Sequence, residues 1–112
     1  MTHQAFTASP SVQKYIAELT GKGLDGAEQQ KRLATLAEFC EFVGRGPDQM
    51  IAEIFDVESQ KYKKRNYYSD RVKEFSAQIS GNWSVRTARG NIIRSFFIAN
   101  GHRLPNEKPD WL

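Results

Sequence analysis

Basic residues are concentrated in one part of this chain, in a pattern that suits the binding of a polyanion. The 112 residues carry a net charge of +3, yet residues 61–103 contain ten Lys and Arg against two acidic residues, whereas residues 1–60 contain five basic and nine acidic residues. Such a positive segment attracts phosphates. The tyrosines beside its lysines can stack or hydrogen-bond on sugars, but we expect Tyr62 and Tyr68 to be partly buried instead, with the lysines extending away from the core. We therefore expect nucleic acid binding; basic side chains that merely solvate helix faces are the alternative that the charge leaves open.

Residues from three parts of the sequence could perform this binding, and we expect the cations of the last two long helices to form one continuous patch. Lys and Arg contact phosphates, Arg pairs with guanine and Asn with adenine. Gly90 inside a helix costs about 1 kcal/mol relative to Ala, so either close helix packing or close approach of a ligand should offset it. The expected DNA-facing residues are Arg86, Thr87, Arg89, Gly90, Asn91 and Arg94 on one helix, Lys61, Lys64 and Arg65 upstream, and Lys31 on an earlier helix.

Other chemistry lacks the residues that it needs. His3, Cys40 and His102 do not have the spacing of a zinc site, and no glycine-rich loop leads into the Lys-Ser or Lys-Thr of a phosphate loop. None of the four tyrosines lies among the Arg and His partners that would activate a phenol. We expect no catalytic residue, no metal, no cofactor and no small-molecule substrate.

Length and composition indicate a single domain with its own core. The lone Cys40 has apolar neighbours, which favours a reduced, packed thiol and a cytoplasmic location. No apolar run approaches the ~20 residues of a membrane-spanning helix, and residues 1–10 lack the features of a signal peptide. We expect no membrane partner.

Turn residues divide the chain into five expected helices. They run from a Ser9 cap and Pro10 to Gly21, from Asp25 or Gly26 to Gly44, from Pro47 to about Phe55, from about Glu58 to Ile79, and from Ser84 to Asn100. The expected buried stripe of the last helix is Val85, Ala88, Ile92, Phe96 and Ala99. No alternating run predicts a strand. The sequence therefore predicts an all-α, compact orthogonal bundle, with residues 1–104 as the core domain and 105–112 as a tail or the start of an interdomain linker.

Three segments together resemble a known family. These are LATLAEFCEFV at 33–43, Pro47-Asp48 opening a short helix, and WSVRTARGNIIRSFF at 83–97 followed by Asn100-Gly101. From about Ser9 to Leu104 the chain resembles the N-terminal core-binding domain of tyrosine recombinases, the phage integrase group, which is a SAM-like helical bundle. The resemblance implies that Arg86, Thr87 and Arg94 contact DNA, that Gly90 and Asn91 face the groove, and that Lys31 contributes.

The resemblance also sets what the chain should not do. Gly90 stands where the family often has a longer polar side chain, and the catalytic domain of a recombinase would follow Leu112. The expectation is a non-catalytic domain of a recombinase that cleaves and rejoins DNA in integration or recombination, with duplex DNA and other recombinase protomers as partners. The alternatives are a helical protein-interaction module whose basic surface binds an acidic partner, and an excisionase-like accessory protein.

Overall fold

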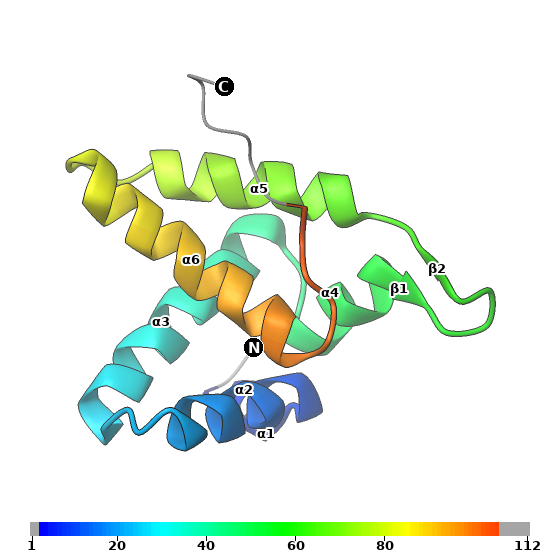
Figure 1. Cartoon of the computed structure of the whole chain (residues 1–112), viewed down its shortest axis with the longest axis horizontal. Coiled ribbons are helices and arrows are strands. Elements are labelled where there is room, and N and C mark those ends of the chain that lie inside the picture. The colour runs from blue at the N-terminus through cyan, green and yellow to red at the C-terminus, as the bar shows by residue number, and fades with distance from the viewer. Residues whose placement is uncertain (1–2, 106–112) are drawn as a thin grey trace.

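The computed structural model describes residues 3–105 and is mostly helical (Figure 1), which confirms the expected fold class. The described elements are α1 (His3–Ala8), α2 (Pro10–Gly21), α3 (Gly26–Val43), α4 (Pro47–Ile54), β1 (Phe55–Asp56), β2 (Lys61–Tyr62), α5 (Arg65–Ala77) and α6 (Trp83–Ala99). Helix α1 and the hairpin were not predicted. Leu104 is buried, so the core extends to this residue, and the expected tail lies outside the described residues except for Pro105. None of the described helices is long and apolar enough to cross a membrane.

Local signals place α3 as expected. The Asp25 carboxylate accepts a hydrogen bond from the Glu28 N–H at 2.8 Å, which satisfies one of the free donors at the start of the helix. At the other end Gly44 has a φ of 70°, the left-handed conformation that glycine adopts without strain. The limits of α3 therefore follow from its own sequence.

The start of α2 is capped differently from the prediction. Ser9 occupies the cap position, but its hydroxyl donates to the Ala5 carbonyl in α1 rather than accepting from α2. The Asp48 carboxylate of α4 accepts instead from the Ser11 N–H at 2.9 Å, and the Asn100 side chain donates to the Ser11 carbonyl at 3.1 Å. A tertiary contact thus replaces the expected local cap.

The expectation of a helix from about Glu58 is wrong, because a hairpin precedes α5. Strands β1 and β2 pair antiparallel with Phe55 opposite Tyr62. In the turn between them the Asp56 carboxylate accepts from the Glu58 N–H at 3.1 Å and from the Ser59 hydroxyl at 2.8 Å. A short acidic side chain that bonds to the backbone two residues later favours a turn over a helix.

The core gathers around α6, which packs against α5, α3 and α2 (Figure 1). The largest fully buried side chains are Tyr15, Tyr68, Phe39, Phe75, Phe96, Phe97, Leu19, Leu36, Met50, Ile54, Ile93 and Val12. Phe39 of α3 meets Phe75 of α5 edge to face at 5.2 Å, which joins those two helices. Cys40 is buried as predicted, and this burial raises the pKa of its thiol to about 12.

The buried face of α6 differs from the predicted stripe. Gly90, Ile93, Phe96 and Phe97 are buried, while Val85 and Ala88 are exposed. The real face is rotated by about one residue, roughly 100° on the helical wheel. The predicted stripe is wrong because α6 packs against α5, α3 and α2, so its apolar residues do not all lie on one buried face.

Gly90 lies at the contact of α6 with α5. A Cβ atom there would lie 2.5 Å from the Ser76 Oγ and 3.6 Å from the Val72 Cγ1. Of the two explanations that the sequence left open, close helix packing is the one that the structure supports. The expectation that Gly90 faces a DNA groove is wrong, because its position is buried.

We predict that Gly90→Val destabilises the protein by about 3 kcal/mol, because the added side chain overpacks the α5–α6 contact. Urea unfolding at pH 7 measures the change. The matched control is Ala88→Val on the same helix, where the site is exposed and the cost should stay below about 1 kcal/mol. Equal stability of the two variants would contradict the packing explanation.

Candidate nucleic-acid interface

The expected DNA-facing residues do not converge on one patch. Arg65 begins α5, whereas the Arg86 Nε donates to the carbonyl of Ile79, beyond the other end of α5, at 3.3 Å. Fourteen residues separate Arg65 from Ile79, and at a rise of about 1.5 Å per helical residue this is about 20 Å. Apart from Lys31, the expected DNA-facing residues therefore divide into a group on α6, which begins near one end of α5, and a group near the hairpin at the other end.

The first group lies on α6, and we call it the α6 group. Its members are Arg86, Thr87, Arg89, Asn91 and Arg94. Arg86 and Asn91 are exposed, whereas Thr87 and Arg94 are partly buried. Trp83, with 78% of its surface exposed, and the exposed Val85 lie at the same end of the helix. The α6 group thus presents fewer polar side chains than the sequence predicts.

Arg89 serves the fold within the α6 group. Its Nη1 donates to the Glu38 carboxylate of α3 at 2.9 Å, and its guanidinium lies over the Phe75 ring at 3.7 Å. The side chain is 19% exposed. An arginine whose charge is paired and whose face is stacked has little left to offer a phosphate.

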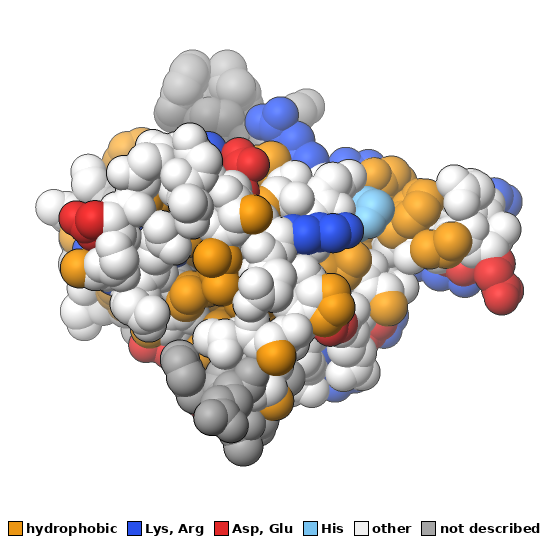
Figure 2. All heavy atoms as spheres, turned by 90° about the horizontal axis from the view of Figure 1, so that it is seen from below, with side chains coloured by type: hydrophobic (Ala, Val, Ile, Leu, Met, Phe, Trp, Pro, Cys, Tyr) orange, Lys and Arg blue, Asp and Glu red, His pale blue; other side chains and the backbone are white. Residues whose placement is uncertain are grey.

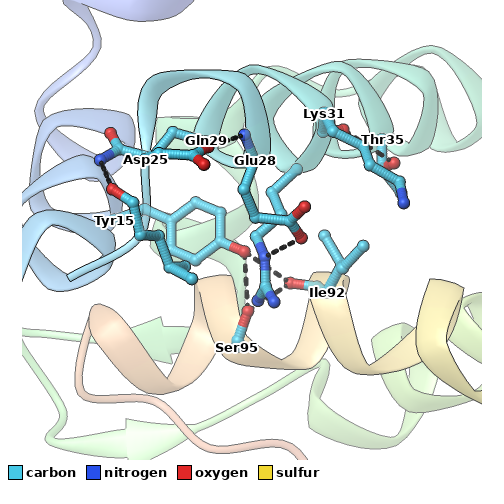
Figure 3. A network of polar contacts seen from close by, with 10 residues as sticks. Tyr15, Asp25, Glu28, Gln29, Lys31, Thr35, Ile92 and Ser95 are labelled. Carbon is cyan, nitrogen blue, oxygen red and sulfur yellow. Dashed lines mark hydrogen bonds and ion pairs between the residues drawn. The ribbon is translucent and has the colours of Figure 1, made fainter. Parts of the chain in front are cut away.

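Lys31 is exposed on α3 (Figure 3). The Thr35 hydroxyl donates to the Lys31 carbonyl at 3.1 Å, one turn along the helix. Figure 3 also shows the polar network between α2 and α6, in which the Tyr15 hydroxyl meets the Ser95 Oγ at 2.8 Å and donates to the Ile92 carbonyl at 3.2 Å. Burial raises the pKa of Tyr15, so this phenol stays protonated and its role is to join the helices.

The second group surrounds the hairpin, and we call it the hairpin-end surface. Its members are Lys14, Lys61, Tyr62, Lys63, Lys64, Arg65, Tyr67, His102 and Arg103. His102 stacks on Phe55 at 5.1 Å, and the Tyr62 ring lies 5.0 Å from Phe55. Figure 2 shows Lys and Arg side chains beside histidine and hydrophobic side chains at this end of the molecule. Cations and aromatic rings thus share one surface.

Ion pairs neutralise part of the hairpin-end surface. Lys63 pairs with Asp56 at 3.2 Å and Lys64 pairs with Glu53 at 3.1 Å. Within residues 3–105, no carboxylate forms an ion pair with the other cations of the surface, which are Lys14, Lys61, Arg65 and Arg103. The surface therefore keeps an excess of positive charge.

Glu53 links three parts of the chain behind this surface. Its carboxylate pairs with Lys64 and with Arg45 at 3.1 Å each, and it accepts a hydrogen bond from the Tyr68 hydroxyl at 3.3 Å. Partial burial acts to raise the pKa of the Glu53 carboxyl, but Lys64, Arg45 and Tyr68 outweigh it, and the pKa lies below its usual value. Glu53 is thus charged at neutral pH.

We predict that Glu53→Gln lowers the free energy of unfolding by about 1 kcal/mol at pH 7, the upper range for such ion pairs. Folding lowers the pKa of this carboxyl. Its contribution to the free energy of unfolding is therefore complete above the pKa of the unfolded state, and it is lost as the pH falls through the pKa of the folded state. Thermal unfolding from pH 7 to pH 3 should show the variant and the wild type converging at low pH. Glu58→Gln, at an exposed turn residue, is the control and should change little; a constant difference at all pH values would contradict the assignment.

His102 lies among cations from separate elements. Its burial lowers the pKa of the imidazole, and the nearby Lys14 of α2 and Arg65 of α5 lower it further. The ring is therefore neutral at pH 7 in the free protein. An anion that approached Lys14 and Arg65 would oppose their effect and favour protonation of His102.

Sequence reasoning identified Lys61, Lys64 and Arg65 but missed Lys14, His102 and Arg103. Lys14 is a single lysine in the acidic half, and the other two residues follow the last helix, where no periodic pattern marks them. No local signal could have joined these positions. Comparison with known protein families, curated proteins and solved structures finds no match for this chain.

Proposed function

We propose that this protein is a non-catalytic DNA-binding domain that holds duplex DNA by its backbone at the hairpin-end surface. The observation that carries the proposal is that Lys14, Lys61 and Arg103 are exposed, form no ion pair with a described carboxylate, and belong to three segments that meet at Tyr62 and His102. Phosphate contacts supply most of the affinity of non-specific binding. The tyrosine hydroxyl and ring suit the sugar-phosphate chain beside them.

The likeness of residues 33–43 and 83–97 to the core-binding domain of tyrosine recombinases supports the same function. In that setting the domain would help to hold a recombination site while a separate domain of the recombinase cuts and rejoins DNA, and other protomers would be its partners. A duplex touched by the α6 group as well would lie along α5, where about 20 Å corresponds to about six base pairs. Binding by this domain alone should be weak and show little sequence preference, because the two domains would share the affinity.

We predict that the affinity for duplex DNA falls steeply with salt, and that the cations of the hairpin-end surface cause this dependence. Fluorescence anisotropy with a 20-base-pair duplex should show the affinity of the wild type falling as salt rises from 50 to 200 mM, with a slope of about 0.9 per phosphate contact. The double variant Lys61→Glu with Arg103→Glu should lose at least tenfold in affinity. Its salt slope should be lower by about 1.8, which corresponds to the loss of two phosphate contacts. Lys22→Glu, a single charge reversal at an exposed residue just after α2, is the control and should bind almost as well as the wild type.

Two results would overturn this proposal. One is the absence of binding by the wild type at 50 mM salt. The other is unchanged binding by the double variant. A larger loss from Arg86→Glu than from the double variant would move the DNA contact to the α6 group.

We also predict that DNA binding takes up a proton at His102. The free imidazole has a lowered pKa, and bound phosphates should raise it, so the complex holds more protons and the affinity increases as the pH falls through the pKa of the bound imidazole. Anisotropy at pH 7.5 and pH 5.5, at constant ionic strength, measures the effect. His102→Gln should remove this dependence, and a variant with the same pH profile as the wild type would disprove it.

Interaction with an acidic protein is the second candidate function. The exposed Trp83 and Val85 beside Arg86 favour it, because protein interfaces often combine a tryptophan with an arginine. The distinguishing measurement is binding of poly-glutamate against duplex DNA at equal salt. Preference for poly-glutamate, lost in Trp83→Ser, would support this function over DNA binding.

A further inference from the structure

The guanidinium of the partly buried Arg65 is bound by other groups of the molecule. Its Nε and Nη2 both donate to the carbonyl of Arg103, at 3.2 Å and 2.6 Å. Its planar face lies over the Tyr62 ring at 4.2 Å. The side chain is therefore already held by two partners, one before it in the chain and one far after it.

Other contacts hold the segments of both partners in place. The Lys63 N–H donates to the Ile54 carbonyl at 2.8 Å, which fixes the base of the hairpin. The Ser69 hydroxyl donates to the Pro105 carbonyl at 3.3 Å, which fixes the segment after α6. Arg65 lies between these two attachments and connects them.

The two partners of Arg65 are next to, or part of, residues that we assign to DNA binding. Lys61 precedes Tyr62 in β2, so the stacking of Tyr62 on Arg65 holds the backbone from which the exposed Lys61 side chain projects. The hydrogen bonds to the Arg103 carbonyl hold the backbone of a residue whose own side chain is an exposed cation. Loss of Arg65 should release both cations at once.

We propose that Arg65 is a positioning residue of the hairpin-end surface, which holds together the two segments that carry Lys61 and Arg103 so that both cations can contact the duplex. This inference rests on the proposed function, and it replaces the direct DNA contact that the sequence predicts for Arg65. Lysine would retain the charge but has no planar guanidinium, so it could not donate from two nitrogens to the Arg103 carbonyl oxygen and lie over the Tyr62 ring at the same time. The role thus depends on the shape of the guanidinium.

The test is Arg65→Lys, measured with the same 20-base-pair duplex between 50 and 200 mM salt. We expect a loss of at least tenfold in affinity and a salt slope lower by about 1.8, which corresponds to two phosphate contacts, although the net charge is unchanged. The matched control is Arg71→Lys on the same helix, where the arginine lies over Tyr67 and pairs with Glu74. That control should bind within twofold of the wild type.

A second measurement needs no DNA. In the NMR spectrum of the free Arg65→Lys variant, the ring signals of Tyr62 and His102 should shift, while the amide signals of α3 stay in place and show that the core is folded. Unchanged Tyr62 and His102 signals would overturn the inference.

The outcomes separate the inference from the proposed function. Should the wild type bind and Arg65→Lys bind with the same affinity and slope, the positioning role is wrong and the proposed function stands. Should the wild type bind no duplex at 50 mM salt, the proposed function fails and the inference fails with it.

Discussion

The close contact of α5 and α6 at Gly90 is the constraint on which the rest of the structure depends. A side chain at this position would meet Ser76 and Val72, so the two helices can approach as they do only because residue 90 has none. Their approach brings Tyr68 to 5.9 Å from Phe97 and closes the core between them. It also fixes the rotation of α6, which leaves Arg86 and Asn91 exposed. The same contact therefore sets both the packing and the outer surface.

The fold redistributes charge that the sequence keeps apart. Carboxylates from residues 1–60 form ion pairs with basic residues from residues 61–103. Glu38 pairs with Arg89, Glu53 with Lys64 and Asp56 with Lys63. Such pairs contribute modestly to stability, but they remove cations from those available to a polyanion. A surplus remains at the hairpin-end surface, because its other cations have no such partner among the described residues.

Arginine and lysine have different roles in this surplus. Arg65 and Arg89 both lie over aromatic rings and donate hydrogen bonds within the molecule. Lys14 and Lys61 are exposed ammonium groups on flexible stems. A planar guanidinium can organise several neighbours, whereas an ammonium suits a point contact with phosphate. This difference is the physical basis for separating positioning from contact at the proposed DNA surface.

The sequence alone determined what depends on a few neighbouring residues. Asp25 and Gly44 mark the ends of α3, Pro10 and Pro47 open their helices, and the fold class follows from these elements. The hairpin was missed because one side chain, that of Asp56, stabilises a turn where no strand pattern exists.

Only the tertiary structure decided which face of α6 is buried and which cations meet. The apolar periodicity of a sequence predicts the buried face of a helix that packs on one side. Helix α6 packs against α5, α3 and α2, so its buried face depends on how all four helices are arranged. Lys61 and Arg65 belong to a basic run that the sequence makes visible, but Lys14 and Arg103 reach the same surface from distant positions. Contacts between residues so far apart in the chain depend on how the helices pack, and no local pattern encodes that packing.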